Sequence, residues 1–485
     1  MNCIDVLRFP VNSYIDETVE YNGKTLIRRC YKNQQYVRQP VNAAYQSLDV
    51  YVPLSYGEKK FCPDKAPVLL LNRCAGYMSY SPVLPRRRPP THMHRRDTSN
   101  APKIGPAPGA EGRGMNAPGD TLNAALASGL VVVIPGNRGR DCVSPDGVYF
   151  GKAPSMIVDL KAAVRYLRHN AGRIPGDMEH IISRGASAGG GMSTLLSCSG
   201  NDPDYEPYLR AIGAAEERDD VFAGVAMSPV MDLEHQDCAY EWQYGKLPLN
   251  GFDNVIKPPV DQKMSAELAA IYEEYLPTLD LMCRKDYGKL TPRNYKEYYL
   301  NEFLLPAADK WLRAQSDETL ELYSSDRPWL HWDGRNASFS FSDYEIYLGR
   351  LKGMPAFDSI ELGQSENTAF GRDTEPAAHY TEYVIRRITG DNTVCVPEHI
   401  MEQRNLLNPM VRLKKGTGQI AEHWWFRLGT KESGFACPLV VNAATAMENR
   451  FEDVNFRLIW DGGHCAEDDL DEQMKWISDI TGYIA

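Results

Sequence analysis

Runs of apolar, β-branched residues that end in turn residues are the most regular feature of the chain. Residues 130–134 read Leu-Val-Val-Val-Ile and run into Pro-Gly, which is typical of a buried strand in a parallel sheet. Residues 157–170 carry apolar side chains on one helical face and basic side chains on the other. A short strand at 181–184 and a helix at 190–198 follow. This order of strand, crossover helix, strand and helix predicts an α/β fold.

Further strand patterns lie on both sides of this unit. Residues 68–71 and 222–227 are apolar runs that end in turns, and residues 424–427 and 454–460 repeat the pattern near the C-terminus. An amphipathic helix at 470–480 closes the chain. We therefore expect a mostly parallel sheet with helices on both faces.

The pattern changes between the two groups of strands. The stretch is rich in Tyr, Trp, Glu and Lys and has helical spacing at 267–276 and 301–314, without the alternation of strand and helix. The 485 residues also exceed the roughly 250–300 at which a single core stops growing. We predict a core in two parts, residues 1–235 and 416–485, with a large inserted lid domain at 236–415.

Residues 82–118 form a second irregular segment, in which Arg86-Arg87-Arg88-Pro89-Pro90 precedes a stretch rich in Pro, Gly and Ala. This composition is typical of a solvated, mobile insertion. The alternative is a basic loop that clamps an acidic ligand. No step of the functional argument depends on this segment.

Composition and charge narrow the function. The net charge of −11 argues against nucleic acid as a partner, because phosphate binding needs a basic face. No apolar run reaches the roughly 18 residues of a membrane span, and the first residues lack the pattern of a signal peptide. The eleven cysteines are scattered without a CxxC pair, which favours reduced thiols. We expect a cytoplasmic enzyme that acts on a small molecule and needs no metal or organic cofactor.

The strongest chemical signal is the pentapeptide Gly185-Ala186-Ser187-Ala188-Gly189, a GxSxG motif between a predicted strand and a predicted helix. Such glycines allow a sharp turn that exposes the serine hydroxyl at a helix N-terminus. The first helical amides there, including that of Ala188, can stabilise an oxyanion. This context predicts the α/β-hydrolase fold with Ser187 as the nucleophile.

A serine nucleophile needs a base and an acid, which follow it along the chain in this fold class. His464 comes directly after the strand at 454–460 and is the predicted base. Glu432 follows the strand at 424–427 and is the predicted acid; Asp232, which follows the strand at 222–227, is the alternative.

A second oxyanion donor normally lies in a loop after an early strand. The loop after residues 68–71 supplies the backbone amides of Gly76 and Tyr77 as candidates. An ordinary strand exit is the alternative interpretation of this loop.

Four blocks of sequence together resemble the bacterial tannases, the tannin acylhydrolases of the intracellular bacterial subtype. They are the serine motif, the loops that carry Glu432 and His464, and a pair of lid segments at 352–358 and 365–371. The resemblance implies a catalytic triad of Ser187, Glu432 and His464. It also implies that Lys352 and Glu366 bind the hydroxyls of a galloyl ring, which an ammonium can donate to and a carboxylate can accept from.

Two positions depart from the family pattern. The family usually has Asp as the triad acid, where this chain has Glu432. It also has a second acid two residues later for a phenolic hydroxyl, where this chain has Gly434.

We therefore predict a serine esterase that hydrolyses galloyl or related phenolic-acid esters through an acyl-enzyme on Ser187. Gly434 motivates one alternative, a feruloyl or general carboxylesterase with the same triad and no gallate preference. A catalytically silent hydrolase fold that binds phenolics or a protein is the other alternative.

Overall fold

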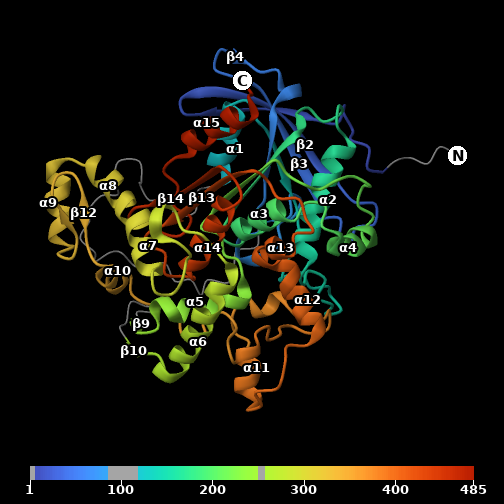
Figure 1. The fold of residues 1–485 in the computed structure, drawn as a ribbon. Coiled ribbons are helices and arrows are strands. Elements are labelled where there is room, and N and C mark those ends of the chain that lie inside the picture. The colour runs from blue at the N-terminus through green and yellow to red at the C-terminus, as the bar shows by residue number, and fades with distance from the viewer. Residues whose placement is uncertain (1–5, 86–117, 250–256) are drawn as a thin grey trace.

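The computed structural model of the protein describes residues 6–85, 118–249 and 257–485. A ten-stranded sheet crosses it in the order β1-β2-β3-β6-β5-β7-β8-β13-β14, with β4 paired to β3 (Figure 1). The strands are β1 (Ile15–Tyr21), β2 (Lys24–Gln35), β3 (Ser47–Tyr56), β4 (Lys59–Lys60), β5 (Pro67–Leu71), β6 (Val131–Pro135), β7 (Asp177–Ala186), β8 (Ala223–Met227), β13 (His423–Gly429) and β14 (Asp453–Ile459). The six strands from β6 to β14 in this order are parallel, and β1, β2 and β3 extend the sheet in antiparallel pairing.

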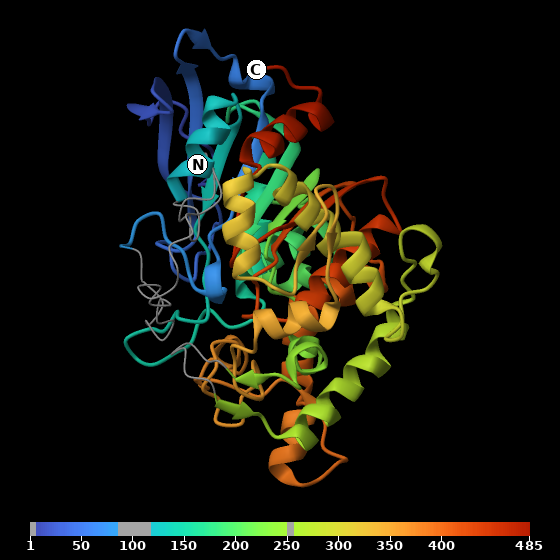
Figure 2. The same ribbon diagram turned by 90° about the vertical axis from the view of Figure 1, so that its left-hand side faces the viewer.

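Helices cover both faces of the sheet, as the sequence predicts. One face carries α2 (Ser155–His169), α3 (Ala188–Cys198) and α14 (Cys437–Glu448), and the other carries α1 (Pro118–Ala127) and α15 (Leu470–Thr481). Within β5, Val68 and Leu70 pack into the first core, and Leu69 and Leu71 pack into the second. This division follows because successive side chains of a strand point to opposite faces. Helices α1 and α15 lie side by side (Figures 1 and 2).

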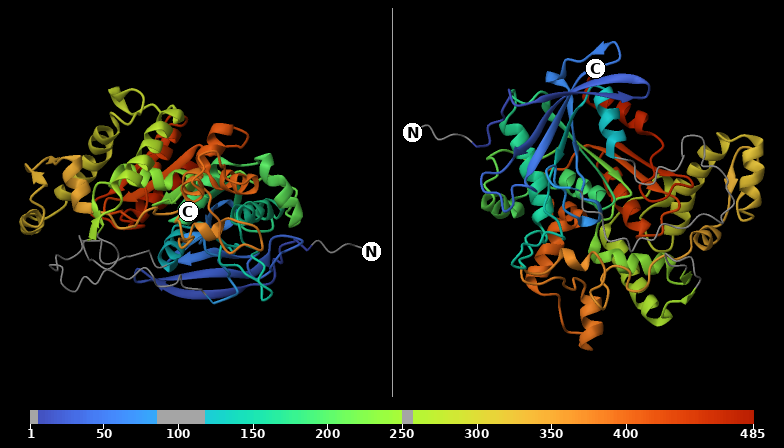
Figure 3. Two further views of the ribbon diagram at one scale, coloured as in Figure 1. Left: turned by 90° about the horizontal axis from the view of Figure 1, so that it is seen from below. Right: turned by 180° about the vertical axis from the view of Figure 1, so that it is seen from behind.

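The chain between β8 and β13 is mainly helical, and none of its described residues joins the ten-stranded sheet. Its elements are α5 (Leu233–Tyr244), β9 (Pro248–Leu249), β10 (Lys257–Pro259), α6 (Gln262–Tyr275), α7 (Tyr295–Tyr299), α8 (Leu305–Arg313), α9 (Asp317–Ser325), β11 (His331–Trp332), β12 (Ala337–Ser338), α10 (Phe341–Leu348), α11 (Glu382–Thr389), α12 (Glu398–Leu407) and α13 (Pro409–Lys415). Figure 3 shows its yellow helices at the opposite side of the molecule from the blue N-terminal strands. The exact division into core and lid domains stays a prediction.

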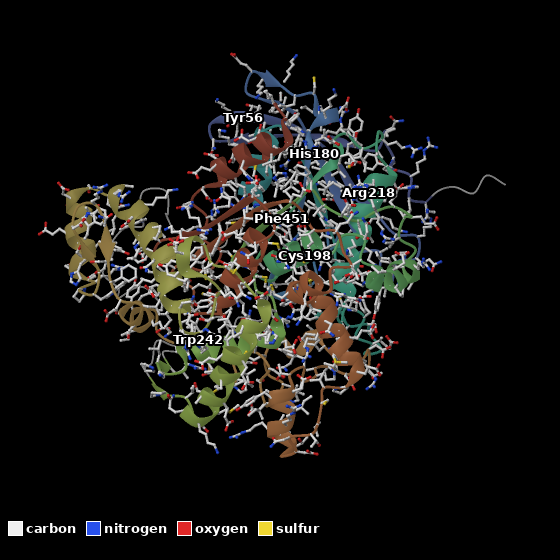
Figure 4. The ribbon with its side chains drawn as sticks, in the orientation of Figure 1. Tyr56, His180, Cys198, Arg218, Trp242 and Phe451 are labelled. Atoms are coloured by element: carbon white, nitrogen blue, oxygen red, sulfur yellow. The ribbon has the colours of Figure 1, made fainter. Side chains whose placement is uncertain are left out.

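Aromatic packing joins the helices of this segment to one another and to the core. Trp242 on α5, labelled in Figure 4, lies 5.3 Å from the ring of Tyr272 and 5.2 Å from the ring of Tyr295. The hydroxyl of Tyr295 donates to the carbonyl of Pro438, and that of Tyr344 donates to the carbonyl of Thr430, each at 2.7 Å. Tyrosine suits these positions because its ring can be buried while its hydroxyl finds an acceptor.

Most predicted elements agree with the structure to within a few residues. The helix predicted at 301–314 is wrong in its first turn, because residues Leu300–Leu304 form a π-helix before α8 begins at Leu305. The basic segment at 82–118 lies almost entirely outside the described residues. Within those residues all ten cysteines are free, and no helix is long and apolar enough to cross a membrane.

Candidate active site

Ser187 is the single residue between β7 and α3, in a backbone conformation that few residues adopt. Its φ is 58° and its ψ is −130°, the strained turn that presents a hydroxyl above a parallel sheet. A Cβ on Gly185 would lie 2.1 Å from the carbonyl oxygen of Gly189, and a Cβ on Gly189 would lie 2.7 Å from Oδ1 of Asn72. Glycine is therefore required at 185, and a side chain at 189 would displace the side chain of Asn72.

The structure brings the three predicted triad residues into one hydrogen-bonded chain. Nε2 of His464 lies 2.8 Å from Oγ of Ser187, and Nδ1 of His464 lies 2.6 Å from Oε2 of Glu432. A carboxylate on Nδ1 favours the tautomer in which Nδ1 carries the proton, so that Nε2 accepts from the serine hydroxyl. The arrangement can therefore withdraw a proton from Ser187.

Electrostatics hold His464 close to its charged form. Burial, the largest single contribution, opposes charge on the imidazole, but the negative charge of Glu432 and its hydrogen bond, together with the interactions with Cys465, raise the pKa of His464 well above its ordinary value. Glu432 itself is buried, with 3% of its surface exposed. The site thus stabilises the imidazolium that forms when His464 takes a proton.

The loops that carry the acid and the histidine pack directly against each other. A Cβ on Gly429 would lie 2.3 Å from the carbonyl oxygen of Gly463, so only glycine fits there. The amide of Lys431 donates to the carbonyl of Gly462 at 2.8 Å, and the amide of Cys465 donates to Oγ of Ser228 at 3.1 Å. These contacts fix the acid and the base relative to the serine.

Asp232, the alternative acid, is fully engaged elsewhere. One oxygen accepts from Asn408 at 2.6 Å and lies 2.8 Å from Nδ1 of His235, and the other accepts from the hydroxyl of Tyr275 at 2.7 Å. His235 in turn stacks on the Tyr275 ring with a centroid distance of 3.4 Å. Asp232 therefore belongs to a buried polar cluster at the start of α5, and its hydrogen bonds do not include His464.

The predicted oxyanion donors divide into two groups. Ala188 is the first residue of α3, where backbone amides have no partner inside the helix. The amide of Tyr77, however, donates to the carbonyl of Cys74 at 3.0 Å, so it is already engaged in a turn, and its role as an oxyanion donor stays a prediction. The amide of Gly76 forms no backbone hydrogen bond within the described residues, and it remains the candidate second donor.

Glu366 lies beside this same loop. Its carboxylate is buried and accepts from Oγ of Ser365 at 2.9 Å. Burial makes the largest contribution to the raised pKa of the Tyr77 hydroxyl, and the negative charge of Glu366 makes the second largest. Arg140 joins the two segments, because it donates to the carbonyl of Gly76 at 2.6 Å and to Oγ1 of Thr368 at 3.2 Å.

Lys352 lies beside the acid loop. Its Nζ is 3.7 Å from the centroid of the Phe357 ring, a distance typical of a cation–π contact. Arg350, which is fully buried and paired with Glu241, donates to the carbonyl of Lys352 at 2.8 Å and to that of Gly353 at 2.9 Å. In the described part of the chain, Lys352 and Glu366 form no ion pair with each other.

One buried carboxylate holds the two lid segments together. Asp358 accepts from Nδ2 of Asn367 at 2.7 Å and from both the amide and the hydroxyl of Thr381, and it lies 2.8 Å from Nδ1 of His379. Its own amide donates to Asp237 on α5 at 2.8 Å. Burial raises the pKa of Asp237 to about 7. The sequence contains no signal for these contacts of Asp358, because the donors lie up to 23 residues away from it along the chain.

Comparisons with known proteins show similarity to esterases and to tannin acyl hydrolases. A family model described as BD-FAE matches residues 145–265. The esterase LipC of Mycobacterium tuberculosis is 39% identical over 56 residues, a match that spans only 12% of this chain and 14% of that esterase. Two solved structures match 98% of this chain and 99% of their own at 30% identity. They are a tannin acyl hydrolase from Lactobacillus plantarum, with a TM-score of 0.82, and a tannin acyl hydrolase in complex with ethyl gallate, with a TM-score of 0.81.

Proposed function

Because this chain belongs to the tannin acyl hydrolases, which are carboxylic ester hydrolases, we propose that it cleaves esters of galloyl or related phenolic acids through an acyl-enzyme on Ser187. The observation that carries the proposal is the hydrogen-bonded chain from Ser187 through His464 to Glu432, with distances of 2.8 and 2.6 Å. The similar enzyme in complex with ethyl gallate supports the phenolic acyl group.

The proposed reaction is acyl transfer to water. His464 takes the proton of Ser187 as its oxygen attacks the ester carbonyl, and the amides of Ala188 and Gly76 donate to the oxyanion. His464 then protonates the leaving alcohol, which departs and leaves the acyl group on Ser187. A water molecule, deprotonated by His464, attacks the acyl-enzyme, the acid departs, and His464 returns the proton to the oxygen of Ser187. Glu432 keeps the imidazole oriented and stabilises its charge through both halves.

Lys352 and Glu366 are proposed to hold the aromatic ring of the acyl group. Their segments are joined at Asp358, and each lies beside one part of the candidate active site. The ammonium of Lys352 can donate to a phenolic oxygen, and the carboxylate of Glu366 can accept from a phenolic hydroxyl. A site with such groups rejects rings that lack the hydroxyls, because its polar groups are then left unpaired.

Gly434 supports a second candidate, a feruloyl or general carboxylesterase. Among the described residues outside 433–435, a Cβ on Gly434 would meet only one heavy atom within 4 Å, Oε1 of Glu432 at 3.4 Å. The open space beside the acid loop could hold the methoxy group of a feruloyl ring as well as a hydroxyl.

Rates on methyl gallate, methyl 3,4-dihydroxybenzoate, methyl ferulate and p-nitrophenyl acetate distinguish the two candidates. We expect kcat/KM for the gallate or dihydroxybenzoate ester to exceed that for the ferulate ester by about 100-fold, as expected where buried polar groups select for a hydroxyl. A preference for ferulate would favour the second candidate. Equal rates on the three aromatic esters would contradict selection by ring hydroxyls.

Removing either ring-binding charge should impair phenolic substrates selectively. For Lys352→Met and Glu366→Gln we expect kcat/KM on methyl gallate to fall by about 10- to 100-fold, because each change removes a charged hydrogen bond to the ring. Rates on p-nitrophenyl acetate should change much less, since this ester has no phenolic acyl ring. Lys289→Met is a matched control, because Lys289 is exposed and, among the described residues, forms an ion pair with Asp280 alone. Equal losses on both esters would show that these residues act on folding or access.

The pH dependence of the rate should depend on Glu432. The base must be neutral to take a proton, so kcat/KM rises as the pH passes upward through the pKa of His464 in the free enzyme. Burial lowers this pKa, but the charge and hydrogen bond of Glu432, together with the interactions with Cys465, raise it well above its ordinary value. In Glu432→Gln we expect the acid limb of the profile to move to lower pH, measured with p-nitrophenyl acetate. An unmoved limb would contradict the proposed coupling of His464 and Glu432.

A further inference from the structure

We propose that Oε1 of Glu432 binds a hydroxyl of the acyl ring, so that one side chain orients His464 with one oxygen and recognises the substrate with the other. This inference rests on the proposed function, and it adds a specificity-determining group to the predicted ring-binding residues Lys352 and Glu366.

The two oxygens of Glu432 have different environments. Oε2 lies 2.6 Å from Nδ1 of His464. Oε1 has no hydrogen-bond partner among the described residues. It keeps some accessible surface, in contrast to atoms such as Oδ1 of Asn72, which lack a partner and are fully enclosed. Oε1 is therefore an unused acceptor that can still be reached from outside the protein. The side chain of Glu432 is only 3% exposed, so few water molecules can donate a hydrogen bond to Oε1. A buried acceptor without a partner costs free energy, and a donor from a ligand would offset that cost.

The open space beside Oε1 has the right position for a ring substituent. A Cβ on Gly434 would lie 3.4 Å from Oε1, and among the described residues no other heavy atom outside 433–435 lies within 4 Å of that point. The longer side chain of Glu432 thus brings a carboxylate oxygen to the edge of the space that Gly434 leaves open. The ring of Phe435 lies next to this site, 5.8 Å from the ring of His464 in an edge-on arrangement.

This space is also adjacent to the segment that carries Lys352. The hydroxyl of Tyr240 donates to the carbonyl of Ser433 at 2.8 Å and accepts from the amide of Lys352 at 3.1 Å. One buried hydroxyl thus fixes the backbone next to Gly434 and the backbone of Lys352 relative to each other. An acyl ring held by Lys352 would therefore present its substituents toward Oε1 of Glu432.

The chemistry of a carboxylate oxygen determines which substituent it selects. An ionised carboxylate only accepts hydrogen bonds, so a phenolic hydroxyl can bind it and a methoxy group at the same ring position cannot. The proposal therefore requires a free hydroxyl at one ring position, and it selects against the methylated phenolic acids that would otherwise fit beside Gly434.

The test combines a variant with a series of substrates that differ by single hydroxyls. Gly434→Ala places a methyl group in the space next to Oε1 and leaves both residues of the Glu432–His464 bond in place. The substrates are methyl gallate, methyl 3,4-dihydroxybenzoate, methyl 3,5-dihydroxybenzoate, methyl 4-hydroxybenzoate and methyl benzoate. We expect kcat/KM to fall about tenfold more for esters with the recognised hydroxyl than for esters without it, as for a lost charged hydrogen bond.

A second pair of variants separates recognition from catalysis. Glu432→Asp keeps a carboxylate for His464 but withdraws Oε1 from the ring, so the ratio of kcat/KM between methyl gallate and methyl benzoate should fall about tenfold. Adding Gly434→Asp should return this ratio toward that of the unmodified protein, because a carboxylate again reaches the hydroxyl. Rates on p-nitrophenyl acetate report whether each variant is folded and active.

Two negative outcomes are distinguishable. If the unmodified protein prefers phenolic-acid esters but the variants lose the same factor on every ester in the series, the role of Oε1 is overturned and the proposed function stands. If the unmodified protein hydrolyses p-nitrophenyl acetate but no phenolic-acid ester, the proposed function fails and the inference fails with it.

Discussion

Ser187→Ala should lower kcat by about 10⁵- to 10⁶-fold on every ester, because no acyl-enzyme can form without the hydroxyl. Nε2 of His464 lies 2.8 Å from Oγ of Ser187, and alanine leaves this base without a proton to take. Any rate that remains above that of the uncatalysed hydrolysis in water would come from the oxyanion donors and substrate binding alone. Initial rates on methyl gallate and p-nitrophenyl acetate measure the loss, and it should be the same on both.

Ser193→Ala is the matched control for this variant. Ser193 lies on α3 but its hydroxyl donates to the carbonyl of Ser183 at 2.9 Å, within the core. We expect a lower unfolding temperature and nearly unchanged kcat. Labelling of the unmodified protein with a serine-directed organophosphonate should map to Ser187. Active, folded protein that remains unlabelled there would contradict the acyl-enzyme mechanism.

Glu432→Ala should give the second largest effect, a loss in kcat of about 10⁴-fold, as expected when the acid of a triad is removed. Without the carboxylate, Nδ1 of His464 loses its 2.6 Å partner, so the imidazole is no longer held in the tautomer and orientation that accept from Ser187. The imidazolium formed during the reaction also loses its compensating charge. Single-turnover rates on p-nitrophenyl acetate would show that the loss is in acylation.

The control for this prediction is Asp232→Asn. Asp232 accepts from Asn408 and Tyr275 and is bonded to His235, so the variant should unfold at a lower temperature and keep its kcat within a few-fold. If Asp232→Asn lost several orders of magnitude in kcat and Glu432→Ala did not, Asp232 would be the acid of the triad.

The sequence was sufficient for those parts of the fold that depend on local pattern. The strand β6 is a continuous apolar run, the helix α2 has apolar residues at helical spacing, and the helix α3 is a run of small and apolar residues, so each pattern is visible within one segment of the chain. The strands β1, β2 and β3 were not predicted. β2 reads KTLIRRCYKNQQ and alternates poorly, and its strand conformation depends on pairing with β1 and β3.

The candidate active site could likewise be predicted only as far as local sequence patterns allow. Ser187, Glu432 and His464 each follow a recognisable strand, so the sequence alone indicated all three. The choice between Glu432 and Asp232 depended on which carboxylate lies near His464 in space. The amide of Tyr77 could not be judged without the turn that binds it to Cys74. Lys352 and Glu366 were indicated only by the family resemblance, because nothing in their local pattern distinguishes them from surface charges.

The hydrogen bonds made by Asp358 have a consequence for the thermodynamics of substrate binding. The segments that carry Lys352 and Glu366 are fixed by this carboxylate before any ester arrives, so little conformational entropy remains to be lost when a ring binds. More of the interaction energy is then available for discrimination between acyl groups. This enzyme should consequently bind the ring of the acyl group as a rigid receptor does. Its affinity should fall steeply when a single hydroxyl is removed from the ester.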